Sequence, residues 1–432
     1  MSSKGSKLRI AFVAVVMIPG TESLSAPAEW CPMDGMIYTR HHLCGRDRCD
    51  EPAERDRWEP GTGTTDLTIR IKFTIFCQDE GLDECAASID DVLDAVGYLN
   101  NDFDDEGIVF AEAVIERERV WDPRFYDFCG SGQQRASCLC DDTCRTGCQS
   151  EELDMKTAYA SSPDEQMNIY VVLHLYENTS YFGYGYWPWC EQATGTLGGI
   201  IIDGRCLGDQ DCLDLIGPPP NKTLSHEMGH NLGLYHVFEG FDPSPPCHAC
   251  YEGAECTGVD PQTGECLNPD CEEVGDFCCD TAASNNSASC SSVEATDCAY
   301  DLVYNPTRRN HMSYADDDCR TYFTDNQAAR LHCWTCDELS SLIPNDQIGS
   351  CCRSGGGCQE TSDTCCDNVG GTFRGSGTTC SEQVSACCIG FNHCIDTTQE
   401  CCATQGGLWI GSDTCQTVPS WRCPTQHGPV GP

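Results

Sequence analysis

Eleven residues, His226 to His236, carry side chains that could hold a metal ion and activate water beside it. They read His-Glu-Met-Gly-His-Asn-Leu-Gly-Leu-Tyr-His. On a helix, the four-residue spacing of His226 and His230 puts both imidazoles on one face, one turn apart. Gly233 permits the positive φ of a sharp helix exit, which would bring His236 back as a third nitrogen ligand. Three histidine ligands leave one coordination position for water or substrate, which is typical of a catalytic zinc site.

Glu227 stands beside the first of these ligands. A carboxylate there can take a proton from an attacking water molecule and pass it to a leaving amine. A lone His-Glu-x-x-His occurs by chance in many helices, but the added glycine and third histidine make coincidence negligible. Histidine is also scarce, with 11 in 432 residues. The pattern therefore predicts catalytic zinc with Glu227 as general base, ahead of a closed structural zinc or calcium site.

Composition limits the classes of partner. The net charge of −43 would repel nucleic acid and anionic membranes, so neither is expected as a partner. The same carboxylates could bind calcium, although most of them need only solvate the surface. The 38 cysteines, an even number, favour disulfides and an oxidising compartment.

The N-terminus predicts export. Lys4, Lys7 and Arg9 precede a short apolar run at 10–18 and a small-residue stretch, so cleavage is expected after Ala26 or Ala28. No segment offers about 18 consecutive apolar residues, so no transmembrane helix is expected. We therefore predict a secreted, extracellular protein.

Periodicity predicts a layered α/β or α+β domain. Residues 67–76 alternate apolar and polar side chains, which indicates a strand with one buried face. Helical spacing covers 86–103, and the zinc helix is expected at 221–234. Further strands are expected at 107–115, 167–175 and 198–203, with a cysteine-dense loop over 129–148.

Two stretches are rich in cysteine. Residues 241–291 form a loop-rich insertion whose Cys247-His-Ala-Cys250 could be a zinc half-site, although disulfides are favoured in this compartment. The C-terminus holds a tandem repeat, in which Cys351-Cys352, Cys358, Cys365-Cys366, Gly370-Gly371 and Cys380 recur as Cys387-Cys388, Cys394, Cys401-Cys402, Gly406-Gly407 and Cys415. Units this small need disulfides in place of a core, and a binding or spacer role is expected.

Several motifs occur in the order found in one peptidase family. Besides the zinc signature, the matching segments are Leu99–Phe103, Tyr184–Trp189, Gly275–Thr281, Asn310–Cys319 and Thr321–Arg330. Over roughly residues 65–340 the chain resembles the pappalysin family of metzincin zinc peptidases. The resemblance implies an α+β fold, with a twisted mixed sheet and two long helices above an irregular lower subdomain.

The resemblance also implies roles for particular residues. Met312 would lie beneath the metal, and the strand near Gly198–Ile202 would be the sheet edge that pairs with an extended substrate. Tyr314 would stabilise the developing oxyanion, with a packed core tyrosine as the alternative. Calcium would bind at Asp276 and Thr281, with Asp280 as a further candidate, and an ordinary turn with a capping aspartate is the competing account.

Cys44, followed by Gly45, resembles the short motif by which related secreted peptidases block the open zinc position with a thiolate. We therefore consider Cys44 as a latency switch. Pairing with Cys31 or Cys49 is the alternative.

The predicted organisation is a signal peptide at 1–28, a pro-segment at 29–63, a peptidase domain at 64–345 and two cysteine-rich repeats at 346–432. The predicted function is hydrolysis of extracellular protein or peptide substrates by a zinc endopeptidase that also uses calcium. The repeats could bind another extracellular component. The alternative function is a secreted disulfide-rich binding or matrix protein whose peptidase domain is vestigial.

Overall fold

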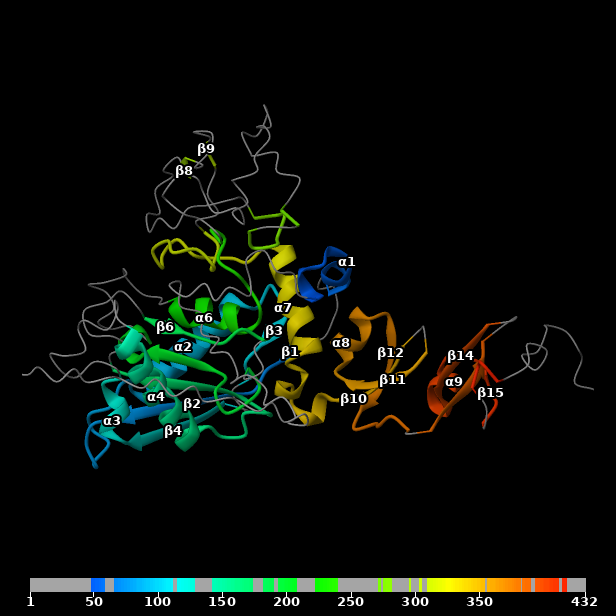
Figure 1. Cartoon of the computed structure of the whole chain (residues 1–432), viewed down its shortest axis with the longest axis horizontal. Coiled ribbons are helices and arrows are strands. Elements are labelled where there is room, and N and C mark those ends of the chain that lie inside the picture. Colours follow the sequence, from blue (N-terminus) through cyan, green and yellow to red (C-terminus); the bar gives the residue numbers. More distant parts are fainter. Residues whose placement is uncertain are drawn as a thin grey trace, which may run out of the picture. The chain divides into compact units, whose positions relative to one another are not determined.

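The computed structural model of the chain describes most of the predicted peptidase domain and repeats (Figure 1). The described residues are 48–58, 66–111, 115–128, 142–173, 182–189, 193–207, 222–239, 271–272, 275–281, 295–296, 303–304, 309–353, 356–381, 383–389, 393–411 and 414–417. The predicted signal peptide, Cys44 and the Cys247–Cys250 motif lie outside these residues.

A five-stranded mixed sheet forms the centre of the peptidase region, and it confirms the predicted α+β class. Its order is β4 (Ile115–Trp121), β2 (Ile71–Cys77), β5 (Met167–Val172), β7 (Ile200–Asp203) and β6 (Gly183–Tyr184). The first four strands are parallel, and β6 runs antiparallel to β7.

Strand β2 differs from its prediction. All seven of its residues are buried, including Lys72 and Thr74, so both faces are covered and not one. Alternation misled here because the polar Lys72 can be buried with a partner, its Nζ lying 3.0 Å from Glu118. The predicted strand at 67–76 is also split, because Leu67–Thr68 forms a separate β1 that pairs with β3 (Ile108–Val109).

The sheet edge is also not where the family resemblance placed it. Strand β7, which contains most of Gly198–Ile202, pairs with β5 on one side and with β6 on the other. The edge is therefore β6, a strand of only two residues within the aromatic segment. A strand this short carries no periodicity, so its place could not be read from the sequence.

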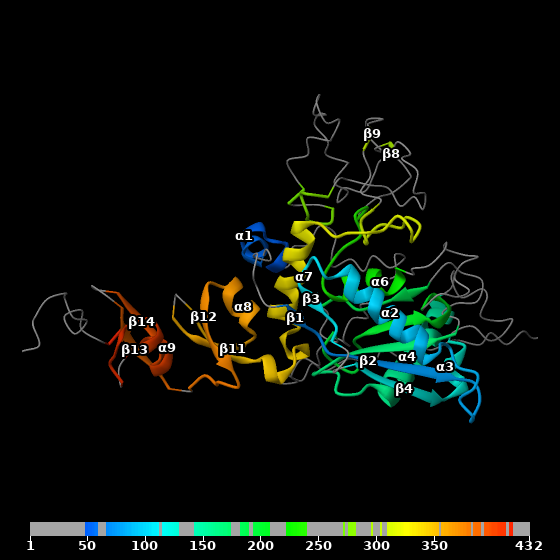
Figure 2. The ribbon, with the colours of Figure 1, turned by 180° about the vertical axis from the view of Figure 1, so that it is seen from behind.

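Four helices accompany the sheet. Helix α2 (Ile89–Asp102) begins at a capping box formed by Ser88 and Asp91, and α6 (Thr223–Asn231) packs against it. Helix α7 (Asp325–Asp337) follows the Met312 segment. Helix α4 (Asp142–Tyr159) begins inside the region predicted as a cysteine-dense loop, so that prediction was wrong beyond Asp142. Figure 2 shows α2 and α6 from behind.

The remaining elements are short. They are the 3-10 turns η1 (Arg48–Asp50), η2 (Asp56–Trp58), η5 (Gly204–Cys206), η7 (Ser340–Leu342) and η8 (Asn345–Gln347), the helices α1 (Pro52–Arg55) and α3 (Pro123–Tyr126), and the antiparallel pair β8 (Ala295–Thr296) and β9 (Val303–Tyr304). No helix among the described residues is both long and apolar enough to cross a bilayer.

The two repeats share one architecture. The first consists of β10 (Gly349–Arg353), β11 (Cys358–Thr361), α8 (Asp363–Asn368) and β12 (Gly371–Ser376). The second consists of β13 (Val384–Cys388), β14 (Cys394–Thr398), α9 (Gln399–Thr404) and β15 (Leu408–Trp409). In each, the first strand lies between the other two.

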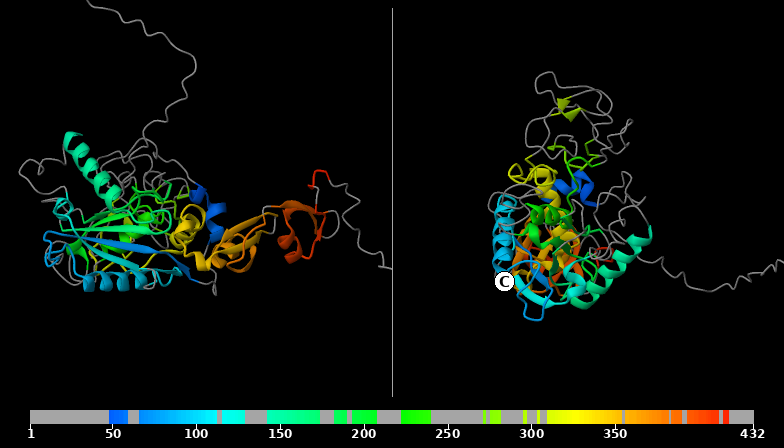
Figure 3. Two further views of the ribbon diagram at one scale, coloured as in Figure 1. Left: turned by 90° about the horizontal axis from the view of Figure 1, so that it is seen from below. Right: turned by 90° about the vertical axis from the view of Figure 1, so that its left-hand side faces the viewer.

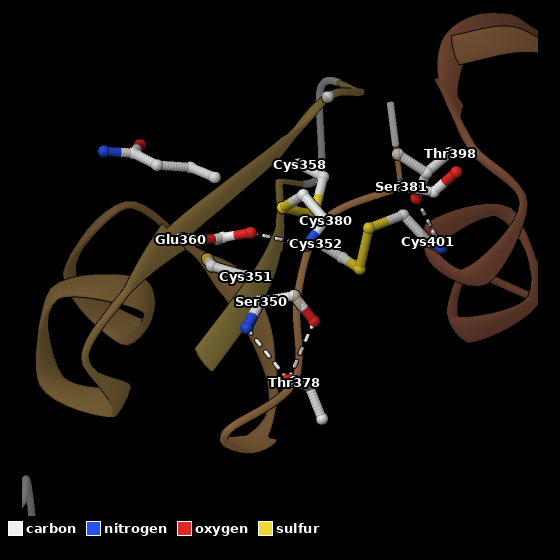
Figure 4. Close-up of a disulfide and its surroundings, with 12 residues drawn as sticks. Ser350, Cys351, Cys352, Cys358, Glu360, Thr378, Cys380, Ser381, Thr398 and Cys401 are labelled. Carbon is white, nitrogen blue, oxygen red and sulfur yellow. Dashed lines mark hydrogen bonds between the residues drawn. A yellow bond between two sulfur atoms is a disulfide. The ribbon is translucent and has the colours of Figure 1, made fainter. Parts of the chain in front are cut away.

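The disulfides of the repeats follow a rule. Two bonds lie within each unit, Cys351–Cys366 and Cys358–Cys380 in the first, Cys387–Cys402 and Cys394–Cys415 in the second. The remaining helix cysteine of each unit bonds backward, Cys365 to Cys336 of α7, and Cys401 to Cys352 of the first repeat (Figure 4).

The paired glycines of the repeats have a packing role. A Cβ at Gly371 would lie 2.4 Å from Cys351 Sγ, and one at Gly407 would lie 2.4 Å from Cys387 Sγ. The second glycine of each pair is therefore needed for the strand to pass over the internal disulfide.

Candidate metal centre

Helix α6 carries the first half of the motif. All nine of its residues are buried, and His226 and His230 lie one turn apart on it. The chain leaves the helix at Gly233, whose φ is +101°. A Cβ there would lie 2.0 Å from the Trp334 ring, so this turn excludes any side chain on two grounds. The turn returns His236 to the other two histidines.

The three imidazoles meet at one point. Their Nε2 atoms are 3.2 Å apart for His226 and His236, 3.2 Å for His226 and His230, and 3.0 Å for His230 and His236. Among the described residues, these three form the single group of three or more metal-binding side chains whose ligand atoms lie within 4.8 Å of one another. Nitrogens bound to one tetrahedral zinc at about 2.0–2.1 Å would be about 3.3 Å apart, so the donor set fits zinc.

Hydrogen bonds set the tautomers of two of the rings. His226 Nδ1 lies 2.7 Å from the His311 carbonyl, and His230 Nδ1 lies 2.7 Å from the Leu234 carbonyl. A carbonyl only accepts, so each Nδ1 carries the proton and each Nε2 presents a lone pair. Burial lowers the pKa of all three histidines, to about 4 for His230, which keeps the rings neutral.

Glu227 lies under the sheet edge. A Cβ at Gly183 of β6 would be 2.8 Å from Glu227 Cγ, so the strand passes directly over this side chain. Burial raises the pKa of Glu227 to about 8, and the charge of Arg320 opposes that rise. A buried carboxyl group with a raised pKa, next in sequence to the first of the three histidines, is suited to proton exchange.

A buried ion pair fixes this edge strand from its other face, where α4 lies (Figure 3). Tyr184 and Tyr186 donate to Glu152 of α4 at 2.7 and 2.8 Å. Lys156, which is fully buried, contacts Glu152 at 2.8 Å and donates to the Leu197 carbonyl at 2.7 Å. The pair therefore connects β6 to α4. In the sequence, Glu152 and Lys156 are visible only as an ordinary i,i+4 helix pair.

A second network supports the start of α6. Asp102, at the end of α2, accepts from Ser225 at 2.6 Å and pairs with Lys222. Arg320 pairs with Asp317 and donates to the His311 carbonyl at 3.4 Å, the same carbonyl that orients His226. Sequence reasoning missed Asp102 because its partners Lys222 and Ser225 lie 120 and 123 residues away along the chain.

Met312 and Tyr314 both lie at the centre. Met312 is fully buried, and its Sδ would be 2.5 Å from a Cβ at Gly229, so it packs beneath α6. Tyr314 is 44% exposed, with its ring centroid 4.8 Å from that of His236. The alternative of a packed core tyrosine is therefore wrong for this side chain.

The Asp276 loop forms a tight turn near the centre. Thr281 Oγ1 lies 2.8–2.9 Å from the Asp276 carboxylate, which also accepts from Cys278 N at 3.1 Å. Burial raises the pKa of Asp276 to about 7; burial and then the charge of Asp276 raise that of Glu239 to about 7. Asp280 is exposed and accepts from Asn326 N. These hydrogen bonds match the competing account of a capping aspartate, and Asp280 faces α7.

The structure excludes one of the two disulfide partners considered for Cys44. Cys49 pairs with Cys333, so it is not the partner of Cys44. Pairing of Cys44 with Cys31 and the latency switch both lie outside the described residues.

Comparisons with known proteins agree with this geometry. Residues 152–334 match the peptidase family described as pregnancy-associated plasma protein-A. Human Pappalysin-1 is 35% identical over 154 residues, which cover 35% of this chain and 8% of that protein. An extracellular metalloprotease of Verticillium alfalfae is 27% identical over 253 residues, 56% of this chain and 67% of the relative.

Among solved structures, mature mirolysin of Tannerella forsythia, in complex with a cleaved peptide, covers 62% of this chain and 91% of its own length. Its sequence identity is 18% and its TM-score is 0.39, a likeness too remote to bear on function.

The histidine triad and its neighbouring glutamate lie within the matched region and have the residue types that zinc-dependent metallopeptidases use. Residues 152–334 are similar to the pappalysin family, as the motifs predicted. The chain spans only 8% of the length of human Pappalysin-1, so the resemblance covers a small part of that relative.

Proposed function

We propose that this protein is a secreted zinc endopeptidase that hydrolyses peptide bonds of extracellular proteins. The observation that carries the proposal is the convergence of the Nε2 atoms of His226, His230 and His236, on a helix that also carries the buried Glu227. Zinc bound by His226, His230 and His236 would supply Lewis acidity for water and for the scissile carbonyl.

The protein's own groups then have defined tasks. Glu227 accepts the proton of the attacking water and delivers it to the leaving amine. The hydroxyl of Tyr314, on an exposed side chain beside His236, donates to the developing oxyanion. Strand β6 lies at the sheet edge over Glu227, so it is the strand to which an extended substrate would add.

The decisive experiment compares Glu227→Gln with the unaltered protein. Glutamine keeps the size of the side chain but cannot accept the proton, so casein cleavage should fall by about 10²–10⁴-fold. Zinc content, measured by atomic absorption, should stay at one equivalent. Glu165→Gln, at an exposed glutamate, is the matched control and should cleave normally. Comparable turnover in Glu227→Gln would falsify the assignment.

The alternative of a vestigial peptidase domain makes a separate prediction. Such a protein would bind zinc yet digest no casein, with or without chelator. The glutamate, the glycine turn and the three histidines are all in place, so we favour the enzyme.

Calcium is our second proposed cation, at Asp276 and Thr281. The buried Asp276 and the half-buried Glu239 have raised pKa values and support it, because a divalent cation would relieve their repulsion. Calcium should raise the melting temperature of chelator-treated protein, and Asp276→Asn should abolish that rise. An equal rise in the variant excludes this site.

Latency through Cys44 also remains a proposal. The cysteine-glycine motif at Cys44-Gly45 supports it. If Cys44 blocks the zinc position, the uncleaved Cys44→Ser protein should digest casein faster than the uncleaved parent. Equal rates exclude the switch. A role of the repeats in binding an extracellular component is proposed on their disulfide-rich build alone.

A further inference from the structure

The N-terminal segment formed by residues 48–58 packs on α7 of the peptidase region. In Figures 1 and 2 the segment, labelled by α1, lies beside that helix. Cys49 is fully buried and bonded to Cys333 of α7, 284 residues away along the chain. Trp58 is also buried at the other end of the segment. Residues 48–58 were predicted to be part of a pro-segment, yet they are covalently joined to the peptidase.

One guanidinium group links this segment to the metal centre. Arg330 of α7 is fully buried and pairs with Asp50, which is fully buried as well. The same guanidinium donates from Nε at 3.1 Å and from Nη2 at 2.8 Å to the carbonyl of Gly233. Gly233 lies in the turn that returns His236 to the other histidines, so Asp50 is two contacts away from the turn that positions His236.

The buried charge of Arg330 requires a counter-charge, and Asp50 supplies it. A buried guanidinium without a counter-charge costs several kcal/mol, and breaking a buried pair by removing one partner is more damaging than replacing both. Among the described residues, Asp50 is the carboxylate that contacts Arg330. Without Asp50, Arg330 would be driven toward water and would release the Gly233 carbonyl.

A second arginine of the segment supports the neighbouring loop. Arg55 is buried and donates from Nη1 at 2.6 Å to the carbonyl of Phe277. Phe277 has a φ of +58°, which a bulky residue keeps only when its surroundings hold it. The ring of Tyr235, next to His236, lies 5.5 Å from that of Phe277. The segment thus contacts the metal centre through a turn and through a loop.

We propose that residues 48–58 are a permanent part of the mature metal centre, in which Asp50 is a positioning residue that holds the Gly233 turn through Arg330. The disulfide Cys49–Cys333 keeps the segment in place even when the chain is cut between residues 58 and 66. The inference rests on the proposed zinc site but not on turnover, so zinc affinity is its readout.

The first test substitutes Asp50 in the full chain. Asp50→Asn should weaken zinc binding by about 10–100-fold in competition with a chelator, as loss of an outer partner of a metal ligand does. Asp50→Glu should recover part of that loss by restoring the charge. Glu51→Gln, at an exposed neighbour, is the matched control and should bind zinc normally. Unchanged zinc affinity in Asp50→Asn overturns the proposal.

The second test does not depend on how well the Asp50 variants fold. A site for a specific protease is inserted within residues 59–65, and the purified, zinc-loaded protein is cut there. The N-terminal fragment should stay attached on a non-reducing gel, with zinc affinity unchanged. In Cys49→Ser/Cys333→Ser protein, the cut should release the fragment and weaken zinc binding by 10-fold or more.

Two results separate this proposal from the proposed function. Release of the fragment with zinc affinity kept within twofold overturns the present inference and leaves the peptidase assignment standing. A protein that loses zinc as expected on release but never cleaves casein supports the inference and refutes the assignment of activity.

Discussion

The peptidase region and the C-terminal repeats are stabilised in different ways. The peptidase region has one apolar cluster that runs through the sheet and its helices, with Phe73, Phe103 and Ile169 fully buried. The buried cluster of the second repeat consists of Cys387, Ile395 and Cys402, two of which form a disulfide. A unit of this size cannot bury enough apolar surface to be stable, so disulfide bonds stabilise it in place of a large apolar core. Among the described residues, fully buried charged pairs such as Arg330–Asp50 lie in the larger region, where the core is extensive enough to surround them.

Removing a core side chain should therefore affect the peptidase region alone. Phe73→Ala in β2 deletes a fully buried ring, and we expect a loss of about 3–5 kcal/mol in the free energy of unfolding. Hydrogen exchange read by mass spectrometry should show lost protection throughout the sheet and unchanged protection in β13–β15, whose buried cluster is separate. Phe373→Ala, at a partly exposed ring of the first repeat, is the control and should cost less. Equal loss in both regions would mean that they unfold as one unit.

Removing a disulfide should destabilise the second repeat and leave the peptidase region unchanged. The Cys387→Ser/Cys402→Ser variant opens a link between cysteines 15 residues apart, which costs about 3 kcal/mol. The second repeat should lose exchange protection while casein cleavage stays unchanged. Cys77→Ser/Cys85→Ser is the matched control in the peptidase region, where β2 is held by a strand on each side. A larger loss in that control contradicts the comparison.

A buried carboxyl of the peptidase region should give the smallest and most pH-dependent effect. Burial raises the pKa of Glu106 from 4.5 to about 7, and its Oε2 has no hydrogen-bond partner. The folded state therefore binds more protons than the unfolded state between these values, and the charge destabilises the fold as pH rises from 4.5 to 7. Glu106→Gln should raise stability at pH 8 by up to about 3 kcal/mol.

The same variant should show no gain at pH 4, where the parent carboxyl is neutral in both states. Thermal unfolding at both pH values measures this difference. A gain that is equal at pH 4 and pH 8 would show that charge is not its cause.

The sequence predicted the features that depend on interactions between residues close together in the chain. The spacing of His226, His230 and His236 identified the convergent ligands, because the helix and the glycine turn lie within eleven residues. The apolar spacing at 86–103 predicted α2, whose capping box is equally local. The cysteine repeat predicted two similar units at the right place in the chain.

Long-range pairing accounts for what the sequence did not reveal. Asp50 and Arg330 are 280 residues apart, and no sequence motif links the two positions. The order of strands is set by the packing of the whole sheet, so the edge position of β6 could not be inferred from two residues. Lys156 and Glu152 read as a surface helix pair, and only the tertiary structure shows them buried under Tyr186.

The backward disulfide of each repeat has a consequence for how such chains can change length. Each unit carries six cysteines. Four of them form two disulfides within the unit, and a fifth bonds to the preceding part of the chain. In the first unit the sixth, Cys352, bonds to Cys401 of the second unit. Cys336 of α7 receives the first unit in the same way. Duplication of one unit would therefore add one cysteine that bonds to the preceding unit and one that bonds to the following unit, so every cysteine would still have a partner. The tail can grow or shorten by whole modules during evolution without a compensating change in the enzyme to which it is attached.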